Sequence, residues 1–485
     1  MTATVDQGTS SRQPSAQSGP GAGRSAPDSA ATRYLFASTA FLALGAVLAL
    51  GALVSMRFPG LFPISLGRLR PMAMIALLLG WLVPGMAAGL FYALPRLTGT
   101  PLRGDGRANA ALPAIIAVVL GGIAIVLLGW GDGRAPFALP WWWDIPVLGL
   151  LSVPFLIVAG SLRDRREEVV YPTLWFAVAG VVWLPALYLI GNLPELSSVA
   201  TALSDLVFEA GFISIWGLGV ATGLAYYVVP KASGQPLANR QLARVGFWSL
   251  LFGGVFMGPA QLVAGPAPEW LQGVAAVLGL AFPIGALANT TNLALTIGPE
   301  WRDIGSRPVL LAAMAGSGLG SLAAVAAALA GFRSNGVLLA FTTFWDGVTH
   351  LLLLGALVLV FVAFAWHVVP NLVGRSLRSE PRASRLVGRS AVAATVTAIL
   401  LMLAGVITGY GWAGASFTGL AENSGADWQP MSIIPSALTG LALLAAIASV
   451  WYTVRLAFSV YSTLTTGRPT LQEVLVVEEE PPDDE

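Results

Sequence analysis

The sequence predicts an all-α polytopic membrane protein with twelve transmembrane helices. Hydrophobic residues make up 56% of its 485 residues and charged residues only 11%, whereas about a quarter of a soluble domain is charged. The mean hydropathy is +0.74. Two further observations support this fold class: twelve stretches are apolar enough to cross a bilayer, and the basic residues gather on one side of them.

Each of the twelve stretches is predicted to be a helix, because backbone polar groups in lipid must be satisfied within the segment and no β-barrel alternation appears. The fourth stretch is short, and the eighth and tenth are long enough to tilt. The predicted spans are 34–56, 71–94, 111–130, 145–162, 169–191, 206–230, 245–265, 270–297, 308–331, 337–369, 390–410 and 433–461.

The distribution of basic residues predicts the orientation. Only five of the 26 basic residues fall in outer loops if the N-terminus is cytoplasmic: Arg57, Arg68, Arg70, Arg134 and Arg333. This positive-inside bias predicts that both termini are cytoplasmic. The run Trp141–Trp143 then falls in an outer loop, as expected of an interfacial aromatic anchor. We expect a multi-pass protein of the inner (cytoplasmic) membrane of a bacterium or archaeon.

Two polar tails flank this membrane domain, which covers residues 34–461. Residues 1–33 are rich in Ser, Gly, Ala and Pro and are predicted to be a disordered cytoplasmic tail. Residues 462–485 are predicted to be an acidic cytoplasmic tail, since seven of the last thirteen residues are acidic.

Composition excludes several kinds of site. The chain has no cysteine, which excludes disulfides, thiolate metal sites and iron–sulfur clusters. Its net charge of +1 gives no sign of nucleic-acid binding, so the lipid bilayer is the predicted partner. The two histidines, His350 and His367, are 17 residues apart on one predicted helix. That separation is roughly 25 Å, so they cannot share a metal and no metal site is predicted.

Twelve helices also suit a secondary transporter. The commonest such architecture joins two six-helix halves through a long central loop, whereas the loop at about 231–244 is short here and no repeat between the halves is visible. A secondary transporter therefore remains an alternative hypothesis, in which Glu209, Asp346 and His350 couple transport to ion or proton binding.

Three segments resemble the catalytic subunit I of heme–copper oxidases, most closely the C-type cytochrome c oxidases and the related nitric oxide reductases. They are Gly67-Arg-Leu-Arg-Pro71, Gly223-Leu-Ala-Tyr-Tyr-Val-Val-Pro-Lys-Ala-Ser-Gly-Gln-Pro236 with Phe247-Trp248, Gly258-Pro259 and Pro268-Glu-Trp270 after it, and His367-Val-Val-Pro-Asn-Leu-Val-Gly-Arg375. Together with the twelve helices, the resemblance covers residues 34–375. It implies three four-helix arcs, and as partners other respiratory-type membrane subunits or a cytochrome c-like protein.

The resemblance also implies a low-spin heme held by two histidines, a high-spin heme held by one and a copper held by three. In this sequence, Ala73 stands at one low-spin ligand position, and the copper-ligand positions are occupied by Ala210, Ala260 and Gln261. The high-spin position reads Val348, and only the second low-spin position keeps its histidine, His350. The outer loop at about 411–432 also lacks the arginines that bind heme propionates in the family.

These replacements predict the loss of the copper centre, since alanine and glutamine do not replace imidazole as copper ligands. Reduction of dioxygen or nitric oxide is therefore not expected, and no cofactor is assigned. One heme b on His350 is an alternative, with Met72 or Met74 beside the lost position as a second ligand. His367, next to Trp366, is expected to have an interfacial or structural role.

Polar residues within the predicted spans are the remaining candidates. Glu209, Gln261, Asp346 and His350 all fall in the outer third of the membrane, and Asp346 and His350 are four apart on one helix face. Such residues are functional candidates, or they form a buried network that fills a cofactor-shaped space. Polar residues also occur in the inner half of the predicted spans. They are predicted either to line a proton path or to form hydrogen bonds between helices: Thr222, Tyr226, Tyr227, Asn289, Thr290, Thr291 and Asn292.

The leading hypothesis is a cytochrome c oxidase subunit I-like protein without a working heme–copper centre. It would act as a structural or assembly subunit, or handle protons or small molecules. An electron-transfer subunit with a single b-type heme on His350 is the second hypothesis, and the transporter is the third. Whether the chain is an enzyme is left open.

Overall fold

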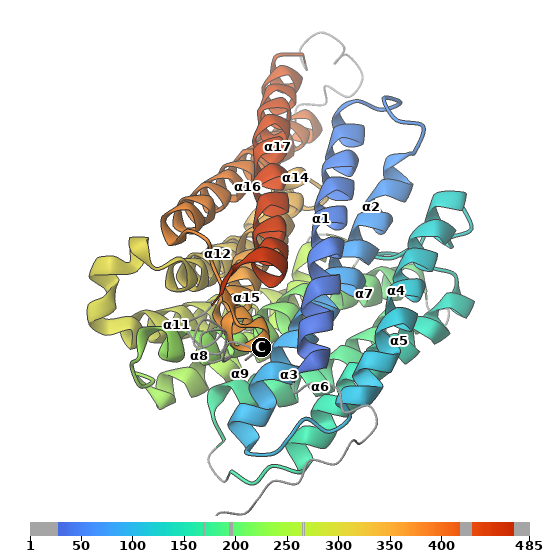
Figure 1. Cartoon of the computed structure of the whole chain (residues 1–485). Coiled ribbons are helices and arrows are strands. Elements are labelled where there is room, and N and C mark those ends of the chain that lie inside the picture. Colours follow the sequence, from blue (N-terminus) through green and yellow to red (C-terminus); the bar gives the residue numbers. More distant parts are fainter. Residues whose placement is uncertain are drawn as a thin grey trace, which may run out of the picture.

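The computed structural model describes residues 28–167, 170–193, 197–263, 265, 267–417 and 429–469. In this part of the chain, twelve helical segments are long and apolar enough to cross a membrane, which confirms the predicted fold class (Figure 1). Most of the first predicted tail, the acidic end of the second and residues 418–428 of the predicted 411–432 loop lie outside the described residues.

The first six spans consist of the elements α1 to α8. Spans two and six each consist of an α-helix, a π-helical segment and a second α-helix. The elements are α1 (Ser29–Arg57), α2 (Leu66–Met74), η1 (Ile75–Leu82), α3 (Val83–Thr98), α4 (Asp105–Leu128), α5 (Trp141–Arg163), α6 (Pro172–Gly191), α7 (Ser198–Gly211), η2 (Phe212–Leu218) and α8 (Gly219–Ser233).

The other six spans consist of the elements α9 to α17. The tenth span, like the second and sixth, contains a π-helical segment, η6. The elements are α9 (Arg240–Gly254), η3 (Val255–Met257), η4 (Pro259–Leu262), α10 (Glu269–Leu278), α11 (Ala281–Ile297), η5 (Gly298–Ser306), α12 (Pro308–Ala330), α13 (Arg333–Leu339), α14 (Thr343–His350), η6 (Leu351–Leu357), α15 (Val358–Val373), α16 (Glu380–Phe417) and α17 (Gln429–Thr466). Two short strands pair antiparallel, β1 (Arg375–Ser376) with β2 (Arg468–Pro469).

Several predicted boundaries were wrong. The tenth span begins at Thr343 rather than 337, because Arg333–Leu339 forms the separate helix α13 and the chain turns at Phe341, where φ is +60°. Trp141–Trp143 form the first turn of α5 and not an outer loop. The indole of Trp143 lies against α4, where it donates a hydrogen bond to the Val118 carbonyl (3.3 Å).

Spans two, six and ten form the centre of the molecule. Their apolar windows are wholly or almost wholly buried, whereas those of most other spans are less than half buried. Their π-helical segments meet at Gly217, where an added Cβ would lie 3.1 Å from Leu82 and 3.4 Å from Leu357. A helix that is hydrophobic all round belongs in such a core, so leucine side chains fill the middle of the bundle.

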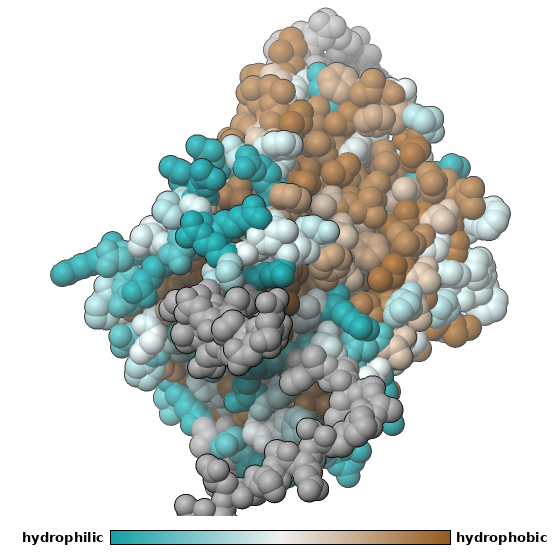
Figure 2. Space-filling model, viewed as in Figure 1, coloured by the Kyte–Doolittle hydropathy of each residue, from teal (hydrophilic) through white to brown (hydrophobic). Residues whose placement is uncertain are grey.

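The outer helices present apolar side chains to the surroundings. Hydrophobic residues dominate the upper part of the surface in Figure 2, over α1 and α17, and Leu444, Trp451 and Phe458 of α17 are more than half exposed. Soluble monomers rarely expose such a continuous apolar surface. This belt is therefore the surface that faces the lipid.

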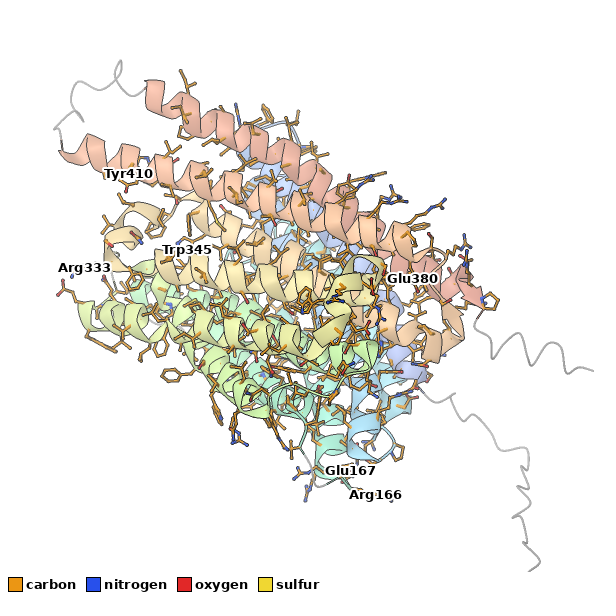
Figure 3. All side chains as sticks on the ribbon, turned by 90° about the vertical axis from the view of Figure 1, so that its left-hand side faces the viewer. Arg166, Glu167, Arg333, Trp345, Glu380 and Tyr410 are labelled. Carbon is orange, nitrogen blue, oxygen red and sulfur yellow. The ribbon has the colours of Figure 1, made fainter. Side chains whose placement is uncertain are left out.

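Charged residues mark the two ends of the bundle. Arg333 lies at one end of the helices, near Tyr410, and Arg166, Glu167 and Glu380 lie at the opposite end (Figure 3). Arg333 belongs to a predicted outer loop and Glu380 to a predicted inner one. We call these the outer end and the inner end, after the predicted orientation.

Candidate functional site

The positions that correspond to the copper ligands lie where two elements touch through their backbones. Ala210 is in α7, and Ala260 and Gln261 are in η4. At Gly258, just before η4, an added Cβ would lie 2.6 Å from the carbonyl oxygen of Leu206 in α7. An alanine side chain has no atom that can bind a metal ion, so Ala210 and Ala260 do not fit a copper centre.

Gln261 does not join the predicted outer cluster. In the described structure its amide donates to the Met257 carbonyl in the preceding turn (3.5 Å). Val348, at the high-spin heme position, is 3% exposed within the hydrophobic core. A valine side chain has no atom that can ligate iron, so the high-spin heme does not fit either.

Arg70 brings the two predicted carboxylates together. Its Nη2 lies 3.9 Å from Glu209 Oε1 and 3.8 Å from Asp346 Oδ1. We call these three residues the Arg70 cluster. They come from α2, α7 and α14, the outer ends of the three central spans. Two carboxylates share one guanidinium, so the formal charge of the cluster is negative when both are ionised.

Beside this cluster lies a cavity of about 170 Å³, the outer cavity. Asp346 and His350 both line it, as expected of residues on one helix face. Arg70, Ala73 and Met74 of the second span line it too, with apolar residues of α1, α16 and α17 around them. The Nε2 atom of His350 is 3.1 Å from the Ser449 hydroxyl oxygen in α17.

The outer cavity fits a low-spin heme in chemistry but not in size. Imidazole and thioether are a sound axial pair for heme iron, and His350 and Met74 line the same space. However, a volume of about 170 Å³ is below the roughly 300 Å³ at which sites for drug-sized ligands begin. The surrounding helices would have to move apart before a heme could enter.

The polar residues of the inner half tie helices together. The Tyr226 hydroxyl donates to Asn289 Oδ1 (2.9 Å), and the Asn292 amide donates to the same hydroxyl (3.2 Å). Thr290 lies 2.8 Å from the Ser321 hydroxyl of α12, whereas Thr222 bonds to a carbonyl of its own helix. These contacts link spans six, eight and nine, as interhelical hydrogen bonds commonly do.

Three of these residues also border a small space. Thr222, Asn289 and Thr290 line a cavity of about 10 Å³, close to the roughly 10–15 Å³ that one water molecule needs. Asn289 Nδ2 is buried and has no hydrogen-bond partner in the described part of the chain. A single water there would satisfy this amide. One water does not make a continuous path.

The structure adds a site that the sequence reasoning missed. A cavity of about 560 Å³, the inner cavity, opens at the inner end and is lined by Tyr92, Arg96, Tyr227, Lys231, His367 and Asn371. His367 therefore lies beside other polar side chains, with its ring 6.2 Å from that of Tyr227. The available signal was Lys231, the only lysine in the sequence.

No group of three His, Asp or Glu side chains suited to a metal ion occurs within the residues described above. Within the described residues, the candidate sites are the Arg70 cluster, the outer cavity and the inner cavity. All three contain side chains of the second and tenth spans, and the Arg70 cluster and the inner cavity also contain side chains of the sixth span.

Comparisons with known proteins agree with the resemblance seen in the sequence. The family model for "Cytochrome C and Quinol oxidase polypeptide I" matches residues 29–442. Cytochrome c oxidase subunit 1 of Rhodobacter capsulatus is 22% identical over 383 residues, which cover 75% of this chain and 71% of that protein. The cbb3-type cytochrome c oxidase subunit CcoN1 of Stutzerimonas stutzeri is 23% identical over 324 residues, with 64% and 68% covered.

A solved structure shares the fold. A heme–copper terminal oxidase dimer determined by cryo-EM superposes with a TM-score of 0.71 over 90% of this chain and 85% of that one. The two sequences are 14% identical, so this likeness shows the architecture alone.

Proposed function

The chain belongs to the cytochrome c and quinol oxidase polypeptide I family, and from that premise we propose that it is a subunit I-like membrane protein without a working heme–copper centre. The observation that carries the proposal is that the positions corresponding to the three copper ligands are occupied by Ala210, Ala260 and Gln261. In this proposal the chain acts as a structural or assembly subunit, or as one that handles protons or small molecules.

We extend the proposal to location and partners. Relatives with matching sequences are bacterial oxidase subunits, which supports a bacterial inner membrane as the location. The distribution of arginines supports both termini in the cytoplasm. The name of one relative describes a subunit of a larger oxidase, and other respiratory-type membrane subunits or a cytochrome c-like protein are the corresponding partners here.

An electron-transfer subunit with one b-type heme is the second candidate. It is favoured by the single observation that His350 and Met74 line one cavity. The volume of that cavity opposes it, which is why we rank it second. A transporter that uses Glu209, Asp346 and His350 ranks third, because the Arg70 guanidinium already holds both carboxylates within 4 Å.

An absorption spectrum with metal analysis tests the proposal. Protein purified from a heme-replete host is expected to show no stoichiometric copper and no heme band in the reduced-minus-oxidised spectrum. If a heme band appears, the second candidate predicts that His350→Ala abolishes it and that His367→Ala, the matched control at the other histidine, leaves it unchanged.

The outcomes separate the candidates. A heme band that disappears in His350→Ala would contradict the leading proposal and support the electron-transfer subunit with one heme. Stoichiometric copper, or a heme band that survives His350→Ala, would show that ligands other than those identified here hold the redox centre.

A further inference from the structure

The inner cavity has the residues of a binding site rather than those of a helix interface. Its six lining residues are all polar or aromatic, and they come from α3, α8 and α15, the inner halves of the three central spans. At about 560 Å³ it is within the range of roughly 300–1,000 Å³ typical of ligand sites. Neither the family's metal positions nor the Arg70 cluster lies here.

Its charges do not balance. Arg96 is compensated, because both of its terminal nitrogens donate to the carboxylate of Asp28 (3.1 and 2.8 Å). Lys231 is different: its ammonium nitrogen lies 4.9 Å from the centre of the Tyr227 ring, and no carboxylate within the described residues forms an ion pair with it. A cation over an aromatic face is stabilised but keeps its charge.

The remaining side chains favour an anion with acceptor oxygens. Asn371 donates a hydrogen bond to the Tyr92 hydroxyl (2.9 Å), and that hydroxyl thereby keeps its own proton to donate to another group. An ammonium beside a phenolic hydroxyl matches a carboxylate, because charge-assisted hydrogen bonds of this type are short and strong.

A source of carboxylates is attached close to the cavity. Strand β1 starts two residues after α15, which carries His367 and Asn371, and β2 pairs with it (Arg375 with Pro469). The end of α17 is held there as well, since Arg375 donates to the Leu464 carbonyl (3.4 Å). Pro469, the last described residue, is thus fixed at the inner end beside the last turn of α15.

The segment that follows is long enough and carries the complementary charge. Seven of its last thirteen residues are acidic, beginning at Glu473. Glu473 is four residues beyond Pro469 and Glu478 is nine, distances of up to roughly 13 and 30 Å for an extended chain at ~3.3 Å per residue. Asn371 is only four residues before Arg375, so this reach includes the inner cavity.

We propose that the inner cavity is a carboxylate-binding site and that its occupant is the acidic segment 473–485 of the same chain. Lys231 provides the charge, and Tyr92 provides a hydroxyl donor. The interaction weakens as ionic strength rises, because partly exposed charges are screened over about 8–10 Å in physiological salt.

The single lysine allows a direct test. A water-soluble carbodiimide joins an amine to a carboxylate that touches it, with loss of one water and no spacer. Besides the N-terminal amine, Lys231 carries the only primary amine in the chain. With the full-length protein in lipid nanodiscs, mass spectrometry is expected to find Lys231 joined to a residue of 473–485 within one monomer, and less of this product at high salt.

Two variants serve as controls. Lys231→Arg keeps the cation and removes the amine, so the product should vanish. In a full-length chain whose seven acidic tail residues are replaced by Gln or Asn, Lys231 should be acylated several-fold faster by an amine-reactive ester than in the unaltered chain. Size-exclusion profiles of the variants check that each remains folded.

The proposal is overturned if Lys231 is readily acylated at the same rate with either tail and forms no amide bond with it. It is also overturned if the tail couples only in products of twice the monomer mass. Cross-linking of Lys231 to a carboxylate elsewhere in the chain would assign the cavity a different occupant.

Discussion

Arg70 stands between two acidic side chains that come from different spans, and its own side chain is 59% exposed. Pairs with this exposure add little to stability when they are considered one at a time. The arrangement matters because Glu209 and Asp346 both approach the same guanidinium. Without it, two carboxylates would face each other near a cavity with mostly apolar walls.

We expect Arg70→Ala to lower the thermal midpoint of the purified protein, by an amount that corresponds to about 1 kcal/mol or less because of the solvent exposure. Adding Glu209→Gln should restore most of the loss, since it removes the repulsion. Thermal unfolding in detergent at low and high salt measures both effects. A double variant that is less stable than Arg70→Ala would contradict the charge explanation.

Helix α9 packs against α11 through glycines, which let the two backbones approach closely. An added Cβ at Gly285 of α11 would collide with the backbone nitrogen of Leu250, and one at Gly253 of α9 with that of Phe282. Small residues allow such contacts between membrane helices. Backbone atoms cannot move aside as a flexible side chain can, so these positions hold the two helices in register.

Gly285→Ala is therefore expected to destabilise the protein by about 1–3 kcal/mol, the usual cost of overpacking. Gly318→Ala in α12 is the matched control, because nothing lies within 4 Å of its added Cβ. That change should be neutral or slightly stabilising, since alanine is the better helix former. Equal effects of the two substitutions on thermal stability would argue against the close contact.

At the scale of the whole molecule, the buried centre and the apolar belt divide the twelve spans into two groups. The three central spans carry the candidate sites, and the peripheral spans face lipid. In the predicted orientation, Arg333 is at the outer end, whereas Arg166 and Glu380 are at the opposite, inner end (Figure 3).

The absence of cysteine from the sequence makes this orientation simple to test. Ser334 and Ser306 are both exposed and lie in predicted outer and inner loops. In right-side-out membrane vesicles, a membrane-impermeant maleimide should label Ser334→Cys at once and label Ser306→Cys only after the membrane is permeabilised. The reverse pattern would invert the predicted topology.

The sequence by itself determined the class of the protein, the number of spans and the family. Apolar length, backbone hydrogen bonding in lipid and arginine distribution are local or additive properties, which can be summed along a chain without knowing its contacts. It also placed His350 and Asp346 on one face, because residues four apart on a helix are neighbours.

Only the tertiary structure decided which distant residues meet. Arg70, Glu209 and Asp346 are far apart in the sequence, and the prediction included Gln261 in their cluster, although η4 directs its amide back to Met257. The inner cavity was missed for the same reason, since Tyr92, Lys231 and Asn371 come from three different spans. Hydropathy fixes how deep a residue lies in the membrane, whereas side-chain and backbone packing between helices decides which residues it faces at that depth.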